Sequence, residues 1–190
     1  MDVLKRLYPT EYVSSIYHIN VSRLWDEGKR AIITDLDNTL VRWNAPSATP
    51  KLVSWLKMVQ DTGFRVCILS NNDRLRVTEF AKPLGLIALD MARKPRLSGF
   101  RHALNLLQVS VAETVMIGDQ VFTDILGGNR MGMYTVLVAP IHEQEYIGTR
   151  VMRRMERIVL RRVPLSQHME YFSYDGEQPS IDLPKGRNDL

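Results

Sequence analysis

The stretch AIITDLDNTLV, residues 31–41, decides the fold class that the sequence predicts. Its first four residues, Ala31 to Thr34, form a short apolar run with two β-branched isoleucines, which is typical of a buried strand. Asp, Asn and Thr residues follow at once, and their short polar side chains bond to nearby backbone and favour a turn. Two carboxylates, Asp35 and Asp37, therefore stand at the carboxyl end of a buried strand, where open α/β sheets bind their ligands.

Strand-like and helix-like segments alternate along the rest of the chain. Further strands are predicted at 64–70, 86–89, 114–117 and 134–138. Helices are predicted at 50–62, 74–84, 97–107 and 120–126, the last of these stopping at Gly127 and Gly128. Five strands that alternate with helices predict a five-stranded parallel sheet covered on both faces, which is a doubly wound, Rossmann-like α/β fold.

Composition and charge narrow the class of protein. The chain has 190 residues, a net charge of +4 and one cysteine, so no internal disulfide or multi-cysteine zinc site is expected. The first residues do not form a secretory signal, and no apolar run approaches the roughly 18 residues of a membrane span. These features predict a cytoplasmic protein without a transmembrane span, and they leave open whether it also lies on the inner face of the membrane.

The turns that follow the next three predicted strands each carry a polar group of a particular kind. Ser70 and Asn71 follow the second strand, Lys94 lies in the loop after the third, and Asp119, with Asp124 five residues on, follows the fourth. Parallel strands end at one edge of a sheet, so these groups can converge with Asp35 and Asp37. Lys82 is a rival for Lys94, but it falls within a predicted helix.

The chemistry of these groups suits phosphoryl transfer. Three carboxylates at one site repel one another unless a cation neutralises them. Oxygen ligands alone are what Mg²⁺ prefers. A hydroxyl, backbone N–H groups and a lysine suit a phosphate. The sequence therefore predicts Mg²⁺ as the cofactor and a phosphate ester as the substrate.

Four short motifs resemble those of the haloacid dehalogenase (HAD) superfamily of phosphatases. They are DLDNT at 35–39, LSN at 69–71, KP at 94–95 and GDQVFTD at 118–124. The resemblance implies that Asp35 is the nucleophile that forms an aspartyl-phosphate, and that Asp37 is the general acid and base. It also implies that Ser70 and Asn71 bind the phosphate and that Thr39 braces the turn. Lys94 would neutralise charge, and Asp35, the Asp37 carbonyl and Asp119 would bind Mg²⁺. Asp124 would support the water shell of the metal or Lys94.

Domain boundaries follow from the motifs and their supporting strands and from the composition of the stretches on either side. Residues 1–30 are expected to form an N-terminal docking arm, and residues 31–140 the HAD-like catalytic core. Residues 141–165 are expected to form a basic amphipathic helix, because the stretch 149–163 contains six arginines and one glutamate. Residues 166–190 are rich in Gly, Pro and charge, and we expect them to be disordered.

The stretches between the motifs are too short to hold a cap domain. In this respect the chain resembles the capless subclass IIIA of the superfamily. The form of the motifs, LSNN and GDQ-x-x-TD, is similar to that of the phosphatidylglycerophosphate phosphatases. That likeness implies a lipid headgroup as substrate. Arg42 and Trp43, which follow the first motif, and Arg93 and Arg96, beside Lys94, are expected to meet the substrate. The arginines of 149–162 are expected to contact an anionic membrane.

Two other functions remain open. The first is a HAD phosphatase for soluble phosphoesters, phosphoproteins or nucleic-acid ends, although we do not expect nucleic acid to be the preferred partner. The second is a regulatory protein that has kept the fold without the activity.

Overall fold

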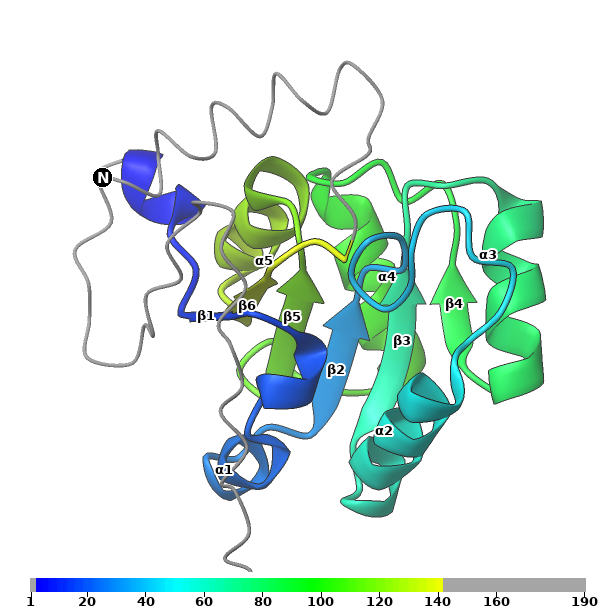
Figure 1. Ribbon diagram of the computed structural model, residues 1–190. Helices are drawn as coiled ribbons and strands as arrows, with labels where there is room; N and C mark the ends of the chain where they lie inside the picture. Colours follow the sequence, from blue (N-terminus) through cyan, green and yellow to red (C-terminus); the bar gives the residue numbers. More distant parts are fainter. Residues whose placement is uncertain (1–2, 142–190) are drawn as a thin grey trace, which may run out of the picture.

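The computed structural model describes residues 3–141, which contain one parallel sheet of six strands in the order β1-β6-β5-β2-β3-β4 (Figure 1). The strands are β1 (Glu11–Val13), β2 (Ala31–Thr34), β3 (Arg65–Leu69), β4 (Ile87–Leu89), β5 (Thr114–Gly118) and β6 (Tyr134–Val138). The predicted doubly wound α/β fold is confirmed, with β2 in the middle of the sheet. The sheet has one more strand than predicted, because β1 comes from the segment before the first motif.

Strand β1 is held by contacts with residues far along the chain. It pairs in parallel with β6, with Glu11 opposite Val136 and Val13 opposite Val138. The Glu11 carboxylate accepts a hydrogen bond from the Tyr134 hydroxyl at 3.0 Å and forms an ion pair with Arg23. Three residues give too short a pattern to predict a strand, and the partner strand lies more than a hundred residues away.

Three of the five α-helices in residues 3–141 begin with a side-chain cap. The five are α1 (Val21–Asp26), α2 (Pro50–Asp61), α3 (Arg74–Ala81), α4 (Leu97–Leu107) and α5 (Leu126–Met131), with 3-10 turns at Val3–Leu7, Ile16–His18 and Lys82–Leu84. The Thr49 hydroxyl accepts a hydrogen bond from Leu52 N at 3.2 Å, and the Asp73 carboxylate accepts one from Arg76 N at 3.0 Å. These two side chains satisfy backbone donors at the starts of α2 and α3.

Alternate residues of each central strand enter different hydrophobic cores. Ile32, Ile68 and Ile117 pack with α1, α2 and α3 on one face of the sheet. Ile33 and Met116 pack with α4 on the other face. Figure 1 shows α1 and α2 in front of the sheet and α4 and α5 behind it. Burial on both faces explains why the central strands are short and almost wholly apolar.

One helix boundary predicted from the sequence is wrong. The helix expected to stop at Gly127 and Gly128 begins with a π-helical turn, Val121–Ile125, and continues through both glycines as α5. A Cβ atom on Gly127 would lie 2.3 Å from Cζ of Phe100, and one on Gly128 would lie 2.7 Å from Cγ2 of Thr135. The glycines therefore allow α5 to pack closely against α4 and β6, and the helix ends at Gly132 instead.

The connections around the first motif are short. Residues 35–64 contain a loop and α2, and residues 70–94 contain α3, a 3-10 turn and β4, so neither connection holds an inserted domain. Within residues 3–141, none of the helices combines the length and apolar character needed to cross a bilayer. The predicted basic helix, apart from residue 141, and the predicted disordered tail lie outside the described residues.

Candidate active site

A cavity of about 400 Å³ opens at the carboxyl ends of the central strands. Apart from Trp43, the residues that line it are polar, and they come from four separate segments that follow β2, β3, β4 and β5. The lining residues are Asp35, Asp37, Asn38, Trp43, Ser70, Asn71, Asn72, Lys94, Gln120 and Thr123. The parallel sheet thus brings together residues of all four predicted motifs, the fourth through Gln120 and Thr123.

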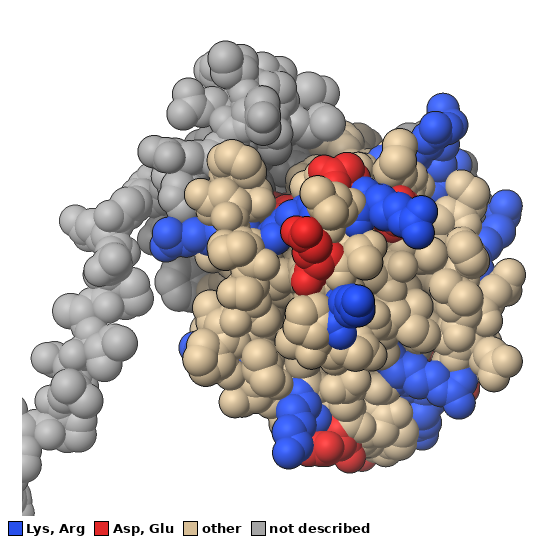
Figure 2. All heavy atoms as spheres, turned by 90° about the vertical axis from the view of Figure 1, so that its right-hand side faces the viewer, with Lys and Arg blue, Asp and Glu red and all other residues tan. Residues whose placement is uncertain are grey.

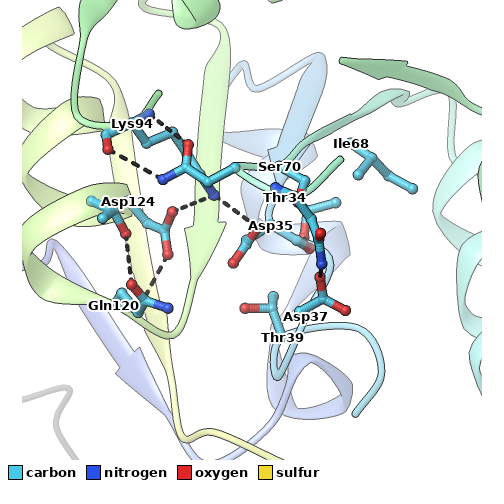
Figure 3. A network of polar contacts seen from close by, with 12 residues as sticks. Thr34, Asp35, Asp37, Thr39, Ile68, Ser70, Lys94, Gln120 and Asp124 are labelled. Atoms are coloured by element: carbon cyan, nitrogen blue, oxygen red, sulfur yellow. Dashed lines mark hydrogen bonds and ion pairs between the residues drawn. The ribbon is translucent and has the colours of Figure 1, made fainter. Parts of the chain in front are cut away.

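Lys94 lies at the centre of a buried charge network (Figure 3). Its Nζ atom is 2.8 Å from Oδ1 of Asp35 and 2.7 Å from Oδ1 of Asp124. The side chains of Lys94, Asp35 and Asp124 are 2%, 9% and 0% exposed, so water screens this network little. Lys82, the rival lysine, is exposed in the 3-10 turn after α3, which leaves Lys94 as the lysine at the cavity.

Three buried carboxylates lie close enough together to bind one cation. A ligand oxygen of each of Asp35, Asp119 and Asp124 lies within 4.8 Å of the others. The Thr39 hydroxyl donates a hydrogen bond to Oδ1 of Asp119 at 3.0 Å, which orients that carboxylate. With all three ionised and Lys94 protonated, the cluster carries two net negative charges. An all-oxygen cluster with that charge fits a divalent cation such as Mg²⁺.

Burial and neighbouring charges shift the pKa values of Lys94 and Asp124. Burial alone would lower the pKa of Lys94, but the adjacent carboxylates of Asp124 and Asp35 raise it above its usual value. Burial raises the pKa of Asp124 to about 6, since loss of hydration and the charge of Asp35 outweigh the attraction of Lys94. A bound cation would oppose that rise, because positive charge favours the ionised carboxylate.

The position of Asp124 depends on the π-helical turn. Gln120 N donates a hydrogen bond to Oδ2 of Asp124 at 3.2 Å, and Ile125 N donates to the Gln120 carbonyl at 3.3 Å. The latter bond spans five residues, one more than in an α-helix. Gly118 lies so near that a Cβ atom there would be 2.3 Å from Cγ of Asp124. The turn therefore seats this carboxylate directly over the end of β5.

Asp37 is held by residues that the sequence did not reveal. Nη2 of Arg76, on α3, is 2.9 Å from Oδ1 of Asp37, and Nδ2 of Asn72 donates to Oδ2 at 3.0 Å. Arg76 also donates to the carbonyls of Ala45 and Arg42, so it ties the loop after β2 to α3. Arg76 is 39 residues from Asp37, and no motif or spacing pointed to it.

The loop after β3 positions both Ser70 and Lys94. Ser70 is buried at 2% exposure, and its hydroxyl accepts a hydrogen bond from Asn72 N at 3.1 Å. The Asn71 side chain accepts from Lys94 N at 2.6 Å and donates to the Lys94 carbonyl at 3.2 Å. The side chain of Asn71 therefore anchors the third motif to the second, an arrangement that the sequence did not predict.

The structure brings most of the predicted site residues together. The cavity is lined by Asp35, Asp37, Ser70, Asn71 and Lys94, and beside it lie the buried side chains of Thr39, Asp119 and Asp124. Among the residues expected to meet the substrate, Trp43 lines the cavity, while Arg42, Arg93 and Arg96 are exposed and outside its lining. Gln120 and Thr123 also line the cavity, although we did not single them out.

Comparison with known proteins agrees with this geometry. Residues 11–132 match the model of a hydrolase family described as haloacid dehalogenase-like hydrolase. The chain is similar to "Probable phosphatase YqeG" of Bacillus subtilis (strain 168), with 40% identity over 170 residues that cover 89% of this chain and 99% of the relative.

More distant similarity extends to two proteins of photosynthetic organisms. Phosphatidylglycerophosphate phosphatase 1 of Arabidopsis thaliana is 26% identical over 81% of this chain and 47% of its own length. Phosphatidylglycerophosphate phosphatase 1 of Chlamydomonas reinhardtii is 29% identical over 77% of this chain and 58% of its own length. This chain thus spans about half the length of each of these two relatives.

Proposed function

The chain belongs to the haloacid dehalogenase-like hydrolases and is a phosphatase, and on that premise we propose that it removes the terminal phosphate of phosphatidylglycerophosphate through an aspartyl-phosphate on Asp35. The observation that carries the proposal is the buried contact of Lys94 with both Asp35 and Asp124 at the floor of the cavity. A lysine so placed forms an ion pair with the proposed nucleophile, and it can neutralise charge that develops on the phosphoryl oxygens.

The reaction has two steps on this chain. In the first step, a carboxylate oxygen of Asp35 forms a bond to phosphorus while the bond from phosphorus to the ester oxygen breaks. Asp37 gives its proton to the departing oxygen. In the second step, Asp37 takes a proton from water as that water attacks phosphorus, and the Asp35–phosphorus bond breaks to release inorganic phosphate. Both steps need Asp37 to be held beside the cavity, which Arg76 and Asn72 do.

Asp35, the Asp37 carbonyl and Asp119 are the proposed ligands of Mg²⁺, with Asp124 supporting both the ion and Lys94. When bound, the ion neutralises charge on the phosphoryl group and the carboxylates. Ser70 and the backbone of Asn71 are the proposed ligands of the phosphoryl oxygens, and both residues line the cavity. Thr39 supports the set by orienting Asp119.

The choice of a lipid substrate rests on two kinds of support. Within residues 3–141 no inserted domain covers the cavity mouth, and this open arrangement supports a phosphate carried on a large molecule. The relatives from Arabidopsis thaliana and Chlamydomonas reinhardtii carry the name phosphatidylglycerophosphate phosphatase 1. The proposed site of action is the inner face of an anionic membrane, where the segment 149–162 is proposed to assist adhesion.

The chemistry is tested by Asp35→Asn, with Asp61→Asn as the control. Asp61 is an exposed residue at the end of α2, so its replacement leaves the cavity untouched. We expect Asp35→Asn to abolish Mg²⁺-dependent hydrolysis of p-nitrophenyl phosphate. After incubation with a substrate whose phosphate is radiolabelled and quenching in acid, this variant should carry no label, because no aspartyl-phosphate forms. Hydrolysis by Asp35→Asn at the rate of the control would refute the assignment of the nucleophile.

The substrate is tested by comparing phosphatidylglycerophosphate in mixed micelles with soluble esters, including glycerol 3-phosphate and a phosphopeptide. The expected result is a kcat/KM for the lipid that exceeds every soluble value. A higher value for a soluble ester would retain the aspartyl-phosphate chemistry and replace the lipid as substrate.

A further inference from the structure

Three segments around the mouth of the cavity each expose both a basic and a large apolar side chain. In each segment an arginine lies within two positions of the apolar residue in the sequence. The three pairs are Arg42 with Trp43 after β2, Arg74 with Leu75 at the start of α3, and Arg93 with Met91 after β4. Together we call these six residues the rim. The rim was not predicted as a unit, and Arg74, Leu75 and Met91 were not singled out.

The apolar members of the rim are strongly exposed. Trp43, Leu75 and Met91 are 45%, 68% and 59% accessible to solvent. Single exposed apolar residues are normal on a protein surface, but several around one opening indicate a contact surface.

Hydrogen bonds show that the three segments surround the same opening. Arg76, the neighbour of Leu75, donates to the Arg42 carbonyl at 3.4 Å and also to the Ala45 carbonyl. Met91 N donates to the carbonyl of Asn72, which lines the cavity, at 2.9 Å. Because Trp43 lines the cavity as well, the rim forms a partial ring of apolar and basic side chains outside the catalytic groups.

The charge of the rim is positive. It contains three arginines. The acidic residues next to it in the sequence are Asp73, whose carboxylate accepts a hydrogen bond from Arg76 N at the start of α3, and the half-buried Asp90. Figure 2 views the molecule from the α3 side, with the carboxyl ends of the strands upward as in Figure 1. Basic side chains occur along this upper edge, with uncharged surface and some acidic groups between them.

We propose that the rim is a docking surface for an anionic lipid bilayer, and this inference rests on the proposed lipid substrate. Trp43, Leu75 and Met91 enter the boundary between headgroups and acyl chains, while the arginines contact lipid phosphates. Docking in this way turns the cavity mouth toward the headgroup layer, so that a phosphate held at the membrane surface can reach Asp35. A protein surface is the rival partner, and the vesicle experiment below decides between them.

The test is sedimentation of the full chain with vesicles of phosphatidylglycerol and phosphatidylcholine, compared with vesicles of phosphatidylcholine alone. The rim variant is a double variant that combines Leu75→Ser and Met91→Ser. The matched control is Ile87→Ser with Leu106→Ser, which removes two exposed apolar side chains, 41% and 45% accessible, that line a hollow away from the rim. Thermal unfolding of each variant verifies that it is folded.

We expect the rim variant to bind anionic vesicles at least about tenfold more weakly than the wild type, because two apolar contacts are lost. The control variant should bind as the wild type does. Arg74→Gln should weaken binding about fivefold at low salt and less at high salt. Equal binding by the rim variant and the wild type would overturn the proposal, since the surface that binds would then lie elsewhere on the chain.

Trp43 offers an independent signal. Entry into the bilayer should shift its emission to shorter wavelength and allow quenching by brominated lipid, and Trp43→Phe should remove that response. A Trp43 emission unchanged by anionic vesicles, or an equal response to phosphatidylcholine alone, would contradict docking of the rim on an anionic surface.

Failure of this inference can be told apart from failure of the proposed function. Vesicle binding by Asp35→Asn measures docking without turnover, whereas hydrolysis of p-nitrophenyl phosphate measures turnover without a membrane. If the rim variant binds vesicles normally while Asp35→Asn is inactive, only the docking surface is refuted. If Asp35→Asn hydrolyses the aryl phosphate normally, only the proposed chemistry is refuted.

Discussion

Replacement of Arg76 tests whether the proposed general acid is positioned by an ion pair from another helix. In Arg76→Met, Asp37 loses the guanidinium at 2.9 Å and keeps only the amide of Asn72 at 3.0 Å. The carbonyls of Ala45 and Arg42 lose the same donor. The change therefore frees both Asp37 and the loop after β2, without touching Asp35 or Lys94.

The cost to stability follows from partial burial of the pair. The side chains of Arg76 and Asp37 are 16% and 18% exposed. Exposed pairs contribute about 0.2–1 kcal/mol, and breaking a buried pair costs about 3–5 kcal/mol. We therefore expect Arg76→Met to lower the free energy of unfolding by about 1–3 kcal/mol, or the Tm by roughly 3–10 °C. Arg101→Met, on the exposed side of α4, is the control.

The effect on rate should depend on the leaving group. A general acid contributes about 10²–10⁴-fold, and it matters most when the departing oxygen needs a proton. We expect kcat/KM of Arg76→Met, which covers the steps up to departure of the leaving group and not the later hydrolysis of the aspartyl-phosphate, to fall about 10–100-fold with an alkyl phosphate. It should fall much less with p-nitrophenyl phosphate, whose leaving group departs unprotonated. Arg76→Lys should recover part of the loss. A loss equal on both substrates, or none on either, would refute a positioning role for Arg76.

Three further predictions concern the core and the acidic cluster. Asp119→Asn should raise the Mg²⁺ concentration needed for half-maximal activity by about tenfold or more, measured by titration against wild type, because the cluster loses one charged ligand. Gly118→Ala should lower both Tm and kcat, since its Cβ would lie 2.3 Å from Cγ of Asp124; unchanged values would contradict the crowding. Burial raises the pKa of the Cys67 thiol to about 12, so a disulfide reagent at pH 8 should modify it only in denaturant. The raised pKa of Cys67 means that the folded state favours the protonated thiol, so the free energy of unfolding should fall as the pH rises above 9 towards 12. The Cys67→Ala variant should lose less of its free energy of unfolding over that range.

The sequence predicted the central part of the fold because its signals are local. The strands at 31–34, 65–69 and 114–118 are short apolar runs that end in turn-forming residues, and their burial on both faces makes the pattern strong. The resemblance to the haloacid dehalogenase superfamily is confirmed by the match over residues 11–132. The assignment of individual roles to the site residues remains a proposal.

The features that the sequence did not reveal depend on contacts between distant residues. Strand β1 pairs with a strand 125 residues away, and the ion pair from Arg76 to Asp37 joins groups 39 residues apart. Gly127 and Gly128 suggested a helix end because glycine is a poor helix former. Their actual function is to admit Phe100 and Thr135, which only the packed structure can show.

The π-helical turn before α5 makes the spacing between Asp119 and Asp124 a fixed quantity. Successive residues of a helix point about 100° apart around its axis. Deleting one residue between the two aspartates, which would restore an ordinary α-helix, would rotate the second carboxylate by about that angle, away from Lys94. In this chain, removing one of the four residues between Asp119 and Asp124 should therefore lower activity more than replacing one of them.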